Sequence, residues 1–332
     1  MSLSTKYHRR SFLRMTALSA AALALPAASQ TVLAQKTQLN NATFYRFRLG
    51  DFQLISISDG ILTIPEPQAF AGTAPPQQFA QVLRDSFQPS KNLPVNCNIL
   101  YINTGRNQAI IDAGSGTLTA PTAGKLLSNL KLAGVNPAEI DTVILTHAHA
   151  DHIGGSTDKN GKFLFPKARY YINRAEHDFW MNPKVSLPKF RGGEKMAKEG
   201  IAIAKKQLNY LSSRLIKFDG EKEIIPGIFA INTPGHTPGH VAIRIISKDA
   251  SLIHTADVIH HFAINLGHPE WQPIFDADPD QAASTRQRLL SQVWKDRSLM
   301  FAYHFPWPGL GHIRQRSEGG YAWEPEPWQF NA

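Results

Sequence analysis

Short apolar segments alternate with helix-like segments along most of the chain, starting near Phe44. Residues 52–57 mix apolar and polar side chains with a period close to two, which predicts a strand with one buried face. Brief apolar runs that end at turn residues predict further strands. These runs are residues 99–103, 109–112, 142–145, 169–172, 228–232, 241–246, 251–255 and 299–303.

Apolar residues at helical spacing predict helices between these strands. The helices are expected at residues 121–132, 174–180, 196–211 and 279–294, the last with Asp278 or Asp280 as its cap. No Gly/Ser-rich linker divides the pattern. We therefore expect residues 35–332 to form a single α/β domain, in which two similar halves pack as a four-layer αββα sandwich.

Residues 182–193 interrupt this pattern with two prolines and two glycines. Such a composition is typical of a loop between regular elements. The loop could form a lid over a site or serve only as a connector, and the sequence favours neither role.

The composition is that of a globular protein, with 42% hydrophobic and 18% charged residues in a chain of 332. It excludes a disordered or collagen-like chain. The single cysteine, Cys97, excludes an internal disulfide framework and a Cys-rich zinc site, and its strand-like surroundings favour packing over reactivity. The 13 histidines instead indicate that any metal site in this chain uses imidazole and carboxylate ligands.

The formal charge of +9 is partly a property of the N-terminus. Residues 1–34 contain four basic and no acidic side chains, which leaves 31 basic and 26 acidic side chains in the remainder, a net charge of +5. No run of Lys and Arg is long enough to form a nucleic-acid-binding stripe. We therefore expect an ordinary basic surface and no nucleic-acid partner.

Residues 1–34 have the organisation of an export signal. The basic residues 8–14 precede an apolar run at residues 15–25, which small residues follow. This run is shorter than the roughly 20 residues that a membrane-spanning helix needs. Adjacent Arg9 and Arg10 before Ser-Phe-Leu resemble a twin-arginine signal, which implies export of a folded protein to the periplasm or beyond the cell. An uncleaved anchor is the alternative.

The strongest chemical signal is the segment Thr-His-Ala-His-Ala-Asp-His at residues 146–152. Residues two apart on an extended segment point the same way, so His147 and His149 can bind one metal ion. Asp151 and His152 then begin a turn or helix that directs a carboxylate and another imidazole to a second point. Because such a cluster would be costly to bury without a ligand, a metal site is the better interpretation.

Two metal ions need further ligands, which other parts of the chain must supply. Pro and Gly residues around His236 predict a rigid turn that presents this side chain inward. Nearby His240 would support the site through a hydrogen bond or simply pack. Asp257 and His304 each follow an expected strand, and strand ends are where sites on such sheets gather. A carboxylate at position 257 could bridge two cations.

The order His-x-His-x-Asp-His, Gly-His, Asp and His resembles the metallo-β-lactamase superfamily, and the match covers nearly all of residues 35–332. Further segments resemble its methyl parathion hydrolase branch, and the ligand motifs are also similar to those of N-acyl-homoserine lactonases. These segments are Leu49-Gly50-Asp51-Phe52 with Ser58-Asp59-Gly60, Asp112-Ala113-Gly114, Asp178-Phe179-Trp180 and the stretch from Phe305 to Ile313.

The resemblance implies two divalent cations, usually zinc, in a shared site. It assigns His147, His149 and His236 to one cation, Asp151, His152 and His304 to the other, and Asp257 to the bridge between them. Two cations about 3.5–4 Å apart can share a hydroxide, because coordination lowers the pKa of water to about 7. Asp151 could also steer the proton of this nucleophile.

Such a site predicts an exported hydrolase that uses a metal-bridging hydroxide to open lactones or similar carboxylic esters. An organophosphate triesterase is the alternative, and a β-lactamase ranks third because a fold does not fix a substrate. A single-iron oxygenase fills only one metal site, whereas Asp151, His152 and His304 together indicate a second one. A metal-binding module without catalysis would not need an open pair of cations. A homodimer is a family-level expectation.

His260 lies three residues past the expected bridging carboxylate. Lactonases that this chain resembles have a tyrosine there, and phosphotriesterase-like relatives have an aliphatic residue. We interpret His260 as a donor to the leaving group, with a surface or supporting histidine as the alternative. Trp180 and Phe262 are predicted to wall an apolar pocket for an acyl or aryl group, whereas Phe179 and Trp271 fit core positions better.

Overall fold

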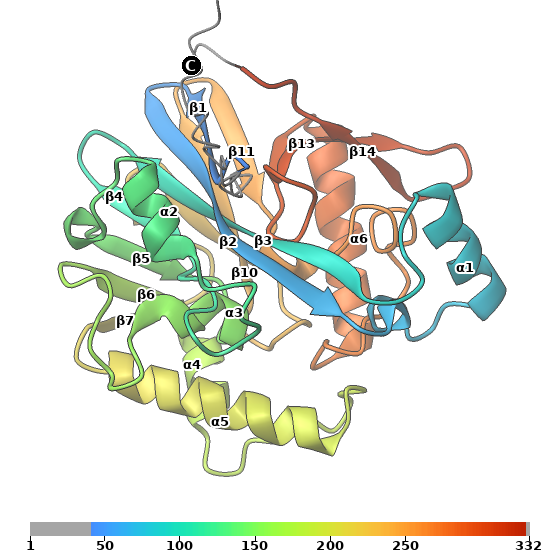
Figure 1. Cartoon of the computed structure of the whole chain (residues 1–332), viewed down its shortest axis with the longest axis horizontal. Helices are drawn as coiled ribbons and strands as arrows, with labels where there is room; N and C mark the ends of the chain where they lie inside the picture. The colour runs from blue at the N-terminus through green and yellow to red at the C-terminus, as the bar shows by residue number, and fades with distance from the viewer. Residues whose placement is uncertain (1–40, 330–332) are drawn as a thin grey trace, which may run out of the picture. The chain divides into compact units, whose positions relative to one another are not determined.

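The computed structural model describes residues 41–329, whose helices and strands are drawn in Figure 1. The expected export signal, residues 1–34, lies outside the described residues. The described part of the chain contains two sheets of seven strands each. Its helices lie on the outer sides of these sheets (Figure 1).

The first sheet uses the N-terminal half of the chain, and its strands lie side by side in sequence order. They are β1 (Phe44–Leu49), β2 (Phe52–Ile64), β3 (Leu93–Asn103), β4 (Gln108–Ile111), β5 (Thr142–Leu145), β6 (Arg169–Asn173) and β7 (Leu215–Phe218). The strands from β1 to β4 pair antiparallel, and those from β4 to β7 pair parallel.

The second sheet uses the C-terminal half of the chain. Its strands, in spatial order, are β14 (Tyr321–Pro325), β13 (Leu310–Gln315), β12 (Leu299–Phe301), β11 (Ala250–His254), β10 (Val241–Ser247), β9 (Ile228–Asn232) and β8 (Lys222–Ile225). All neighbours pair antiparallel except β11 and β12, which are parallel.

Helices cover the outer face of each sheet (Figure 1). The α-helices of the described residues are α1 (Pro76–Asp85), α2 (Leu126–Leu132), α3 (Ala150–Ile153), α4 (Arg174–Met181), α5 (Glu194–Leu211) and α6 (Pro279–Lys295). Helices α2 and α4 contact the first sheet, and α6 contacts the second. This layering confirms the predicted α/β class and the four-layer αββα sandwich.

The space between the sheets is filled by one face of each strand. In β10, Val241, Ile243 and Ile245 are fully buried there, while Arg244 between them is exposed. This alternation follows from the two-residue period of a strand. Because each buried aliphatic side chain stabilises the fold by about 1.5–3 kcal/mol, this layer gives the sheets a rigid frame for the segments at their ends.

The helix predicted at residues 121–132 begins only at Leu126 in the structure. The preceding segment wraps around the buried carboxylate of Asp59, which accepts hydrogen bonds from the N–H groups of Ser115, Gly124 and Leu126. Gly124 has a φ of +74°, which excludes a helical conformation at this residue. The prediction that this helix begins at residue 121 was therefore wrong, because the N–H groups of the preceding loop bind the carboxylate of Asp59.

The strands predicted from the apolar pattern are shorter than β2 and β3, and most strands at the edges of the sheets were not predicted. Strands β2 and β3 have 13 and 11 residues, so the predicted segments 52–57 and 99–103 are only parts of them. Strands β1, β7, β8, β13 and β14 were not predicted. In β7, β8 and β14 at most one residue is buried, β1 alternates with exposed residues, and β13 exposes its end. Edge strands lack the continuous burial that makes a strand recognisable.

Within residues 41–329, none of the helices combines the length and the apolar character needed to cross a lipid bilayer. The longest helix, α5, has 18 residues and carries Lys and Glu side chains along its exposed face.

Candidate metal centre

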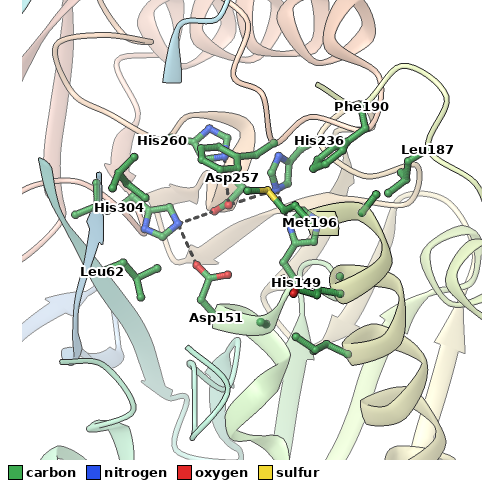
Figure 2. Close-up of a pocket in the computed structure, with 18 of the residues that line it drawn as sticks. Leu62, His149, Asp151, Leu187, Phe190, Met196, His236, Asp257, His260 and His304 are labelled. Carbon is green, nitrogen blue, oxygen red and sulfur yellow. Dashed lines mark hydrogen bonds and ion pairs between the residues drawn. The ribbon is translucent and has the colours of Figure 1, made fainter. Parts of the chain in front are cut away.

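The predicted metal ligands come together from segments that each follow a strand, and Figure 2 shows five of them in one cluster. They are His147, His149, Asp151 and His152 after β5, His236 after β9, Asp257 after β11 and His304 after β12. Strand β5 runs straight into the first of these segments, and α3 begins at Ala150. The local fold therefore separates an extended pair of histidines from a helical Asp-His pair, as the sequence predicts.

Asp257 is the centre of this cluster, because its two carboxylate oxygens face different histidines (Figure 2). Its Oδ2 lies 3.4 Å from Nε2 of His236 and 3.9 Å from Nε2 of His147. Its Oδ1 lies 3.2 Å from Nε2 of His152 and 3.5 Å from Nε2 of His304. A carboxylate in this orientation suits a bridge between two cations.

The Oδ2 side of Asp257 holds three imidazoles. Ring nitrogens of His147, His149 and His236 lie within 4.8 Å of one another, as the ligands of one ion would. Nδ1 of His149 is only 2.9 Å from Nε2 of His236. Because Nδ1 of His236 donates to Asp276, its Nε2 presents a lone pair, which can accept a hydrogen bond from His149 or coordinate a cation that both rings share.

The Oδ1 side of Asp257 combines a second carboxylate with two imidazoles. Oδ2 of Asp151 lies 3.4 Å from Nε2 of His304 and 3.5 Å from Nε2 of His152. Imidazole and carboxylate ligands of this kind suit zinc and similar divalent cations. The structure thus assembles two separate ligand groups that share Asp257.

Several atoms of this cluster are buried without a hydrogen-bond partner. They include Nε2 of His147, Nε2 of His152 and Oδ1 of Asp257. A buried polar atom that lacks a partner costs about 1–3 kcal/mol. Two cations held between the ligand groups would coordinate all three atoms, so the residues present fit a pair of metal ions.

Hydrogen bonds to the far ring nitrogens orient two of these imidazoles. Nδ1 of His152 lies 2.8 Å from Oδ2 of Asp112, and Nδ1 of His304 donates to the carbonyl of Asn96 over 2.8 Å. Asp112 is itself held by the N–H and the hydroxyl of Thr146, each 2.8 Å away. With the proton on Nδ1, each ring presents the Nε2 lone pair to the cluster, as a metal ligand must.

His236 is oriented by a longer chain of contacts. Its Nδ1 lies 2.9 Å from Oδ1 of Asp276, and Oδ2 of Asp276 lies 3.3 Å from the guanidinium of Arg286. Arg286 is fully buried in α6 and also donates to three backbone carbonyls between residues 258 and 271. This chain of contacts ties helix α6 to the loop that follows Asp257, and the sequence analysis did not find it.

His240 supports the cluster without joining it as a ligand. Its Nε2 accepts the backbone N–H of Asp257 over 3.2 Å, and its Nδ1 lies 2.8 Å from the hydroxyl of Thr233. Of the two roles predicted for His240, the structure favours the hydrogen bond over simple packing.

The carboxylates divide the histidines of the cluster into two electrostatic classes. Burial lowers the pKa of His149 to about 3. Burial acts in the same direction on His152, but the carboxylates of Asp257, Asp151 and Asp112 outweigh it and raise the pKa of His152 to about 10. The negative potential around His152 therefore favours a positive charge at this point, as a proton or as a metal ion.

The cluster lies at one side of a cavity of about 290 Å³ whose other walls are apolar except for Glu199 (Figure 2). The walls are formed in part by Leu62, Phe70, Leu187, Phe190, Met196 and Phe275. None of these six was a sequence prediction. Loop 182–193 contributes Leu187 and Phe190, so it forms part of the cavity wall and is more than a connector. Two large apolar residues in a loop rich in Pro and Gly were the signal for this role.

The two predicted pocket residues have different positions in the structure. Trp180 is only 1% exposed and lines the cavity. Phe262 is not among the lining residues, because the chain turns after His260 and directs Phe262 toward Phe305 in the core beneath α6. Cys97 is fully buried, and burial raises the pKa of its thiol to about 12, in keeping with a packing role.

The family description "Metallo-beta-lactamase superfamily" matches residues 92–304, more than half of the chain. The chain belongs to the metallo-β-lactamase superfamily. The matched range ends at His304 and contains every residue of the ligand cluster. The sequence family and the geometry of the site therefore agree.

Several curated members of the metallo-β-lactamase superfamily are related to this chain in sequence. An N-acyl homoserine lactonase of Bacillus thuringiensis is 25% identical over 233 residues, which cover 64% of this chain and 82% of the relative. An N-acyl homoserine lactonase of a Bacillus species is 28% identical over 181 residues, which cover 54% of this chain. This chain spans only 62% of the length of that second relative.

Solved structures of the superfamily match more of the chain. AidC, a dizinc quorum-quenching lactonase in complex with a product, N-hexanoyl-L-homoserine, has a TM-score of 0.82 and 31% identity, and the match covers 87% of this chain and 100% of AidC. The hydrolase AbOPH has a TM-score of 0.80 and 28% identity, with 87% and 99% covered. These relatives are metal-dependent hydrolases and lactonases of the same superfamily.

His260 lies between the metallo-β-lactamase ligand cluster and the apolar walls of the cavity. Its Nε2 is 3.4 Å from Oδ2 of Asp257, and its ring is T-shaped to that of His236 (Figure 2). Neither ring nitrogen has a hydrogen-bond partner, although the side chain is buried. Burial lowers the pKa of His260, so the neutral imidazole keeps one N–H group that is free to donate.

The substitution Asp257→Ala should remove at least one metal ion, because it deletes the oxygen contacts to both ligand groups. We expect the metal content of the folded protein to fall from about two ions to one or none per chain by elemental analysis, and hydrolysis to fall at least about a hundredfold. The exposed Asp219, which pairs with Arg174, supplies the control Asp219→Asn, with unchanged metal content. Two ions retained in Asp257→Ala would refute the bridging role.

Proposed function

We propose that this protein is a hydrolase with two divalent cations, zinc by preference, that opens lactones or similar carboxylic esters. The observation that supports the proposal best is the position of Asp257, whose two oxygens face two complete ligand groups beside an apolar cavity. One filled site, as in a single-iron oxygenase, would leave the group of Asp151, His152 and His304 unexplained.

When bound, the cation pair supplies an acidified water as nucleophile and polarises the C=O group of the substrate. The protein orients the imidazoles of His152, His236 and His304 through their Nδ1 hydrogen bonds, so that each ring directs its Nε2 toward the cluster. Asp151 retains 16% exposure of its side chain and lines the cavity, so its carboxylate can accept a hydrogen bond there and orient the proton of the nucleophile. The apolar walls limit access of bulk water to these groups.

The walls of the cavity favour a neutral substrate with an apolar substituent. Among the described residues that line the cavity there is no Lys or Arg, and Glu199 adds a negative charge. β-Lactam antibiotics carry a carboxylate next to the lactam ring, and the described lining of this cavity has no Lys or Arg side chain to pair with it. A neutral lactone or ester with an acyl chain fits these walls better.

The relatives support the same substrate class and suggest a probe. AidC, as its structure is described, is a dizinc lactonase with N-hexanoyl-L-homoserine as a product. An N-acyl homoserine lactone unites a neutral ester with an apolar chain, and we propose this class of compound as substrate. A neutral aryl phosphotriester has similar polarity and size, so organophosphate hydrolysis is the second candidate.

A comparison of rates on four substrates tests the proposal. We expect the purified holoenzyme to hydrolyse N-hexanoyl homoserine lactone with a kcat/KM at least tenfold above that for an aryl ester, an aryl phosphotriester and nitrocefin. Treatment with a strong chelator should abolish the lactone hydrolysis, and added zinc should restore it. A faster phosphotriester reaction would establish the second candidate instead, and lactone hydrolysis that survives metal removal would refute both.

His260 is the group that we propose to donate to the leaving oxygen. The substitution His260→Phe should lower kcat for the lactone tenfold or more and leave the metal content unchanged, because it removes the donor but no ligand. The matched control is His268→Phe, since His268 stacks on Trp271 and does not line the cavity. An unchanged kcat and pH–rate profile in His260→Phe would assign this residue a structural role.

Export is a further proposal, supported by the basic and apolar segments at residues 8–25. We expect the full chain in a bacterial host to reach the periplasm through the twin-arginine route, because the paired arginines stand at its N-terminus. Cell fractionation should find the double variant Arg9→Lys, Arg10→Lys in the cytoplasm. Equal periplasmic amounts of both proteins would refute the twin-arginine assignment.

A further inference from the structure

Glu176, the third residue of α4, is a fully buried carboxylate outside the ligand set. Its Oε1 accepts hydrogen bonds from the N–H of Ala148 at 3.0 Å and from the indole N–H of Trp180 at 2.6 Å. Its Oε2 accepts hydrogen bonds from the hydroxyl of Thr237 at 2.6 Å and from the N–H of Gly239 at 3.0 Å. Each carboxylate oxygen therefore accepts two hydrogen bonds.

The partners of Glu176 all belong to the surroundings of one metal site. Ala148 lies between the ligands His147 and His149, and Thr237 directly follows the ligand His236. Trp180 lines the cavity, and its ring is T-shaped to that of His149 at 5.9 Å. A single side chain thus links the two chain segments that supply all three imidazoles of the first ligand group.

The hydrogen-bond partners of Glu176 favour its ionised form. Burial raises the pKa of Glu176, but its oxygens receive four hydrogen bonds, three of them from N–H groups that can only donate. These hydrogen bonds lower the pKa and favour the ionised carboxylate. Of the hydrogen bonds and ion pairs found among residues 41–329, none gives Glu176 a Lys or Arg partner. A buried anion without a cationic side chain is stabilised by a metal ion bound nearby.

Close packing reinforces this link. A Cβ atom added to Gly239 would lie 2.0 Å from the backbone nitrogen of Glu176 and 2.6 Å from its Cβ. Only glycine allows the segment after His236 to approach the start of α4 this closely.

We propose that Glu176 is a positioning residue for the first metal site, which holds the segment of His147 and His149 in register with that of His236 and adds a negative charge that favours the bound cation. The inference depends on the two-metal centre and is independent of which ester is hydrolysed. Helix α4 would then contribute to metal binding through Glu176, in addition to its contact with the first sheet.

The substitution Glu176→Gln tests the proposal, because it keeps the shape of the side chain, removes the charge and turns an NH2 group toward two donors. Competition between the holoenzyme and a zinc-binding dye should show one of two zinc ions bound 10- to 100-fold more weakly. The rise in melting temperature that zinc gives to the protein should shrink accordingly. Neither measurement uses ester hydrolysis, so a wild-type protein that binds two zinc ions without opening lactones would refute only the proposed function.

Two control variants separate positioning from general stability. Asp59→Asn makes the same change at another buried carboxylate, whose three N–H partners belong to residues 115–126 and include no metal ligand. It should lower the melting temperature and leave both zinc affinities unchanged. Asp178→Asn removes an exposed charge from the same helix and should change neither property.

Either of two results would overturn the proposal. One is wild-type zinc affinity in Glu176→Gln, and the other is an equal loss of affinity in Asp59→Asn. If Glu176→Gln does not fold, Thr237→Val removes only the hydroxyl that donates to Oε2. In this variant the affinity for one of the two zinc ions should fall about three- to tenfold. Unchanged zinc affinity in Thr237→Val would equally refute the role of Glu176.

Discussion

The burial of one carboxylate, that of Asp257, between two sets of imidazole nitrogens is the constraint on which the rest of this structure depends. Its oxygens lie 3.2–3.9 Å from five different histidines, and one of these oxygens has no hydrogen-bond partner. Such an arrangement is costly for a protein without bound cations and favourable with them. The fold must therefore hold these buried side chains close together, which lowers the stability of the metal-free protein. Metal binding offsets this loss of stability.

The frame that holds them is a set of buried acidic residues, each of which connects a ligand to a different element. Asp112 connects His152 to the end of β4, Asp276 connects His236 to α6 through Arg286, and Glu176 lies at the start of α4. Because these contacts come from both sheets and their helices, the relative position of the two halves determines the spacing of the ligands. The rigid apolar layer between the sheets thus contributes to metal binding at a distance.

The sequence could indicate the residues that the structure brings together in this cluster, because their signals are local or lie at strand ends. Residues 146–152 form one contiguous motif, and the preceding strand at residues 142–145 was predicted with its observed bounds. Asp276 and Glu176 had no such signal, since a single acidic residue in a loop or helix acquires a role only from partners distant in the chain. Phe262 was placed in the pocket wrongly for the same reason, because the turn after residue 260 cannot be inferred from composition.

A similar contrast applies to function. The two cations determine the type of reaction, and the cavity walls determine which substrate is bound. A cation pair can activate water toward carbon or phosphorus, so the ligand cluster alone defines a hydrolase. The discrimination between substrates must come from groups that contact the substrate but not the metal ions. In this cavity those groups are apolar side chains, Glu199 and His260, whose two ring nitrogens have no hydrogen-bond partner. A neutral substrate with an apolar chain and a leaving oxygen that accepts a hydrogen bond satisfies both, and a lactone has these properties.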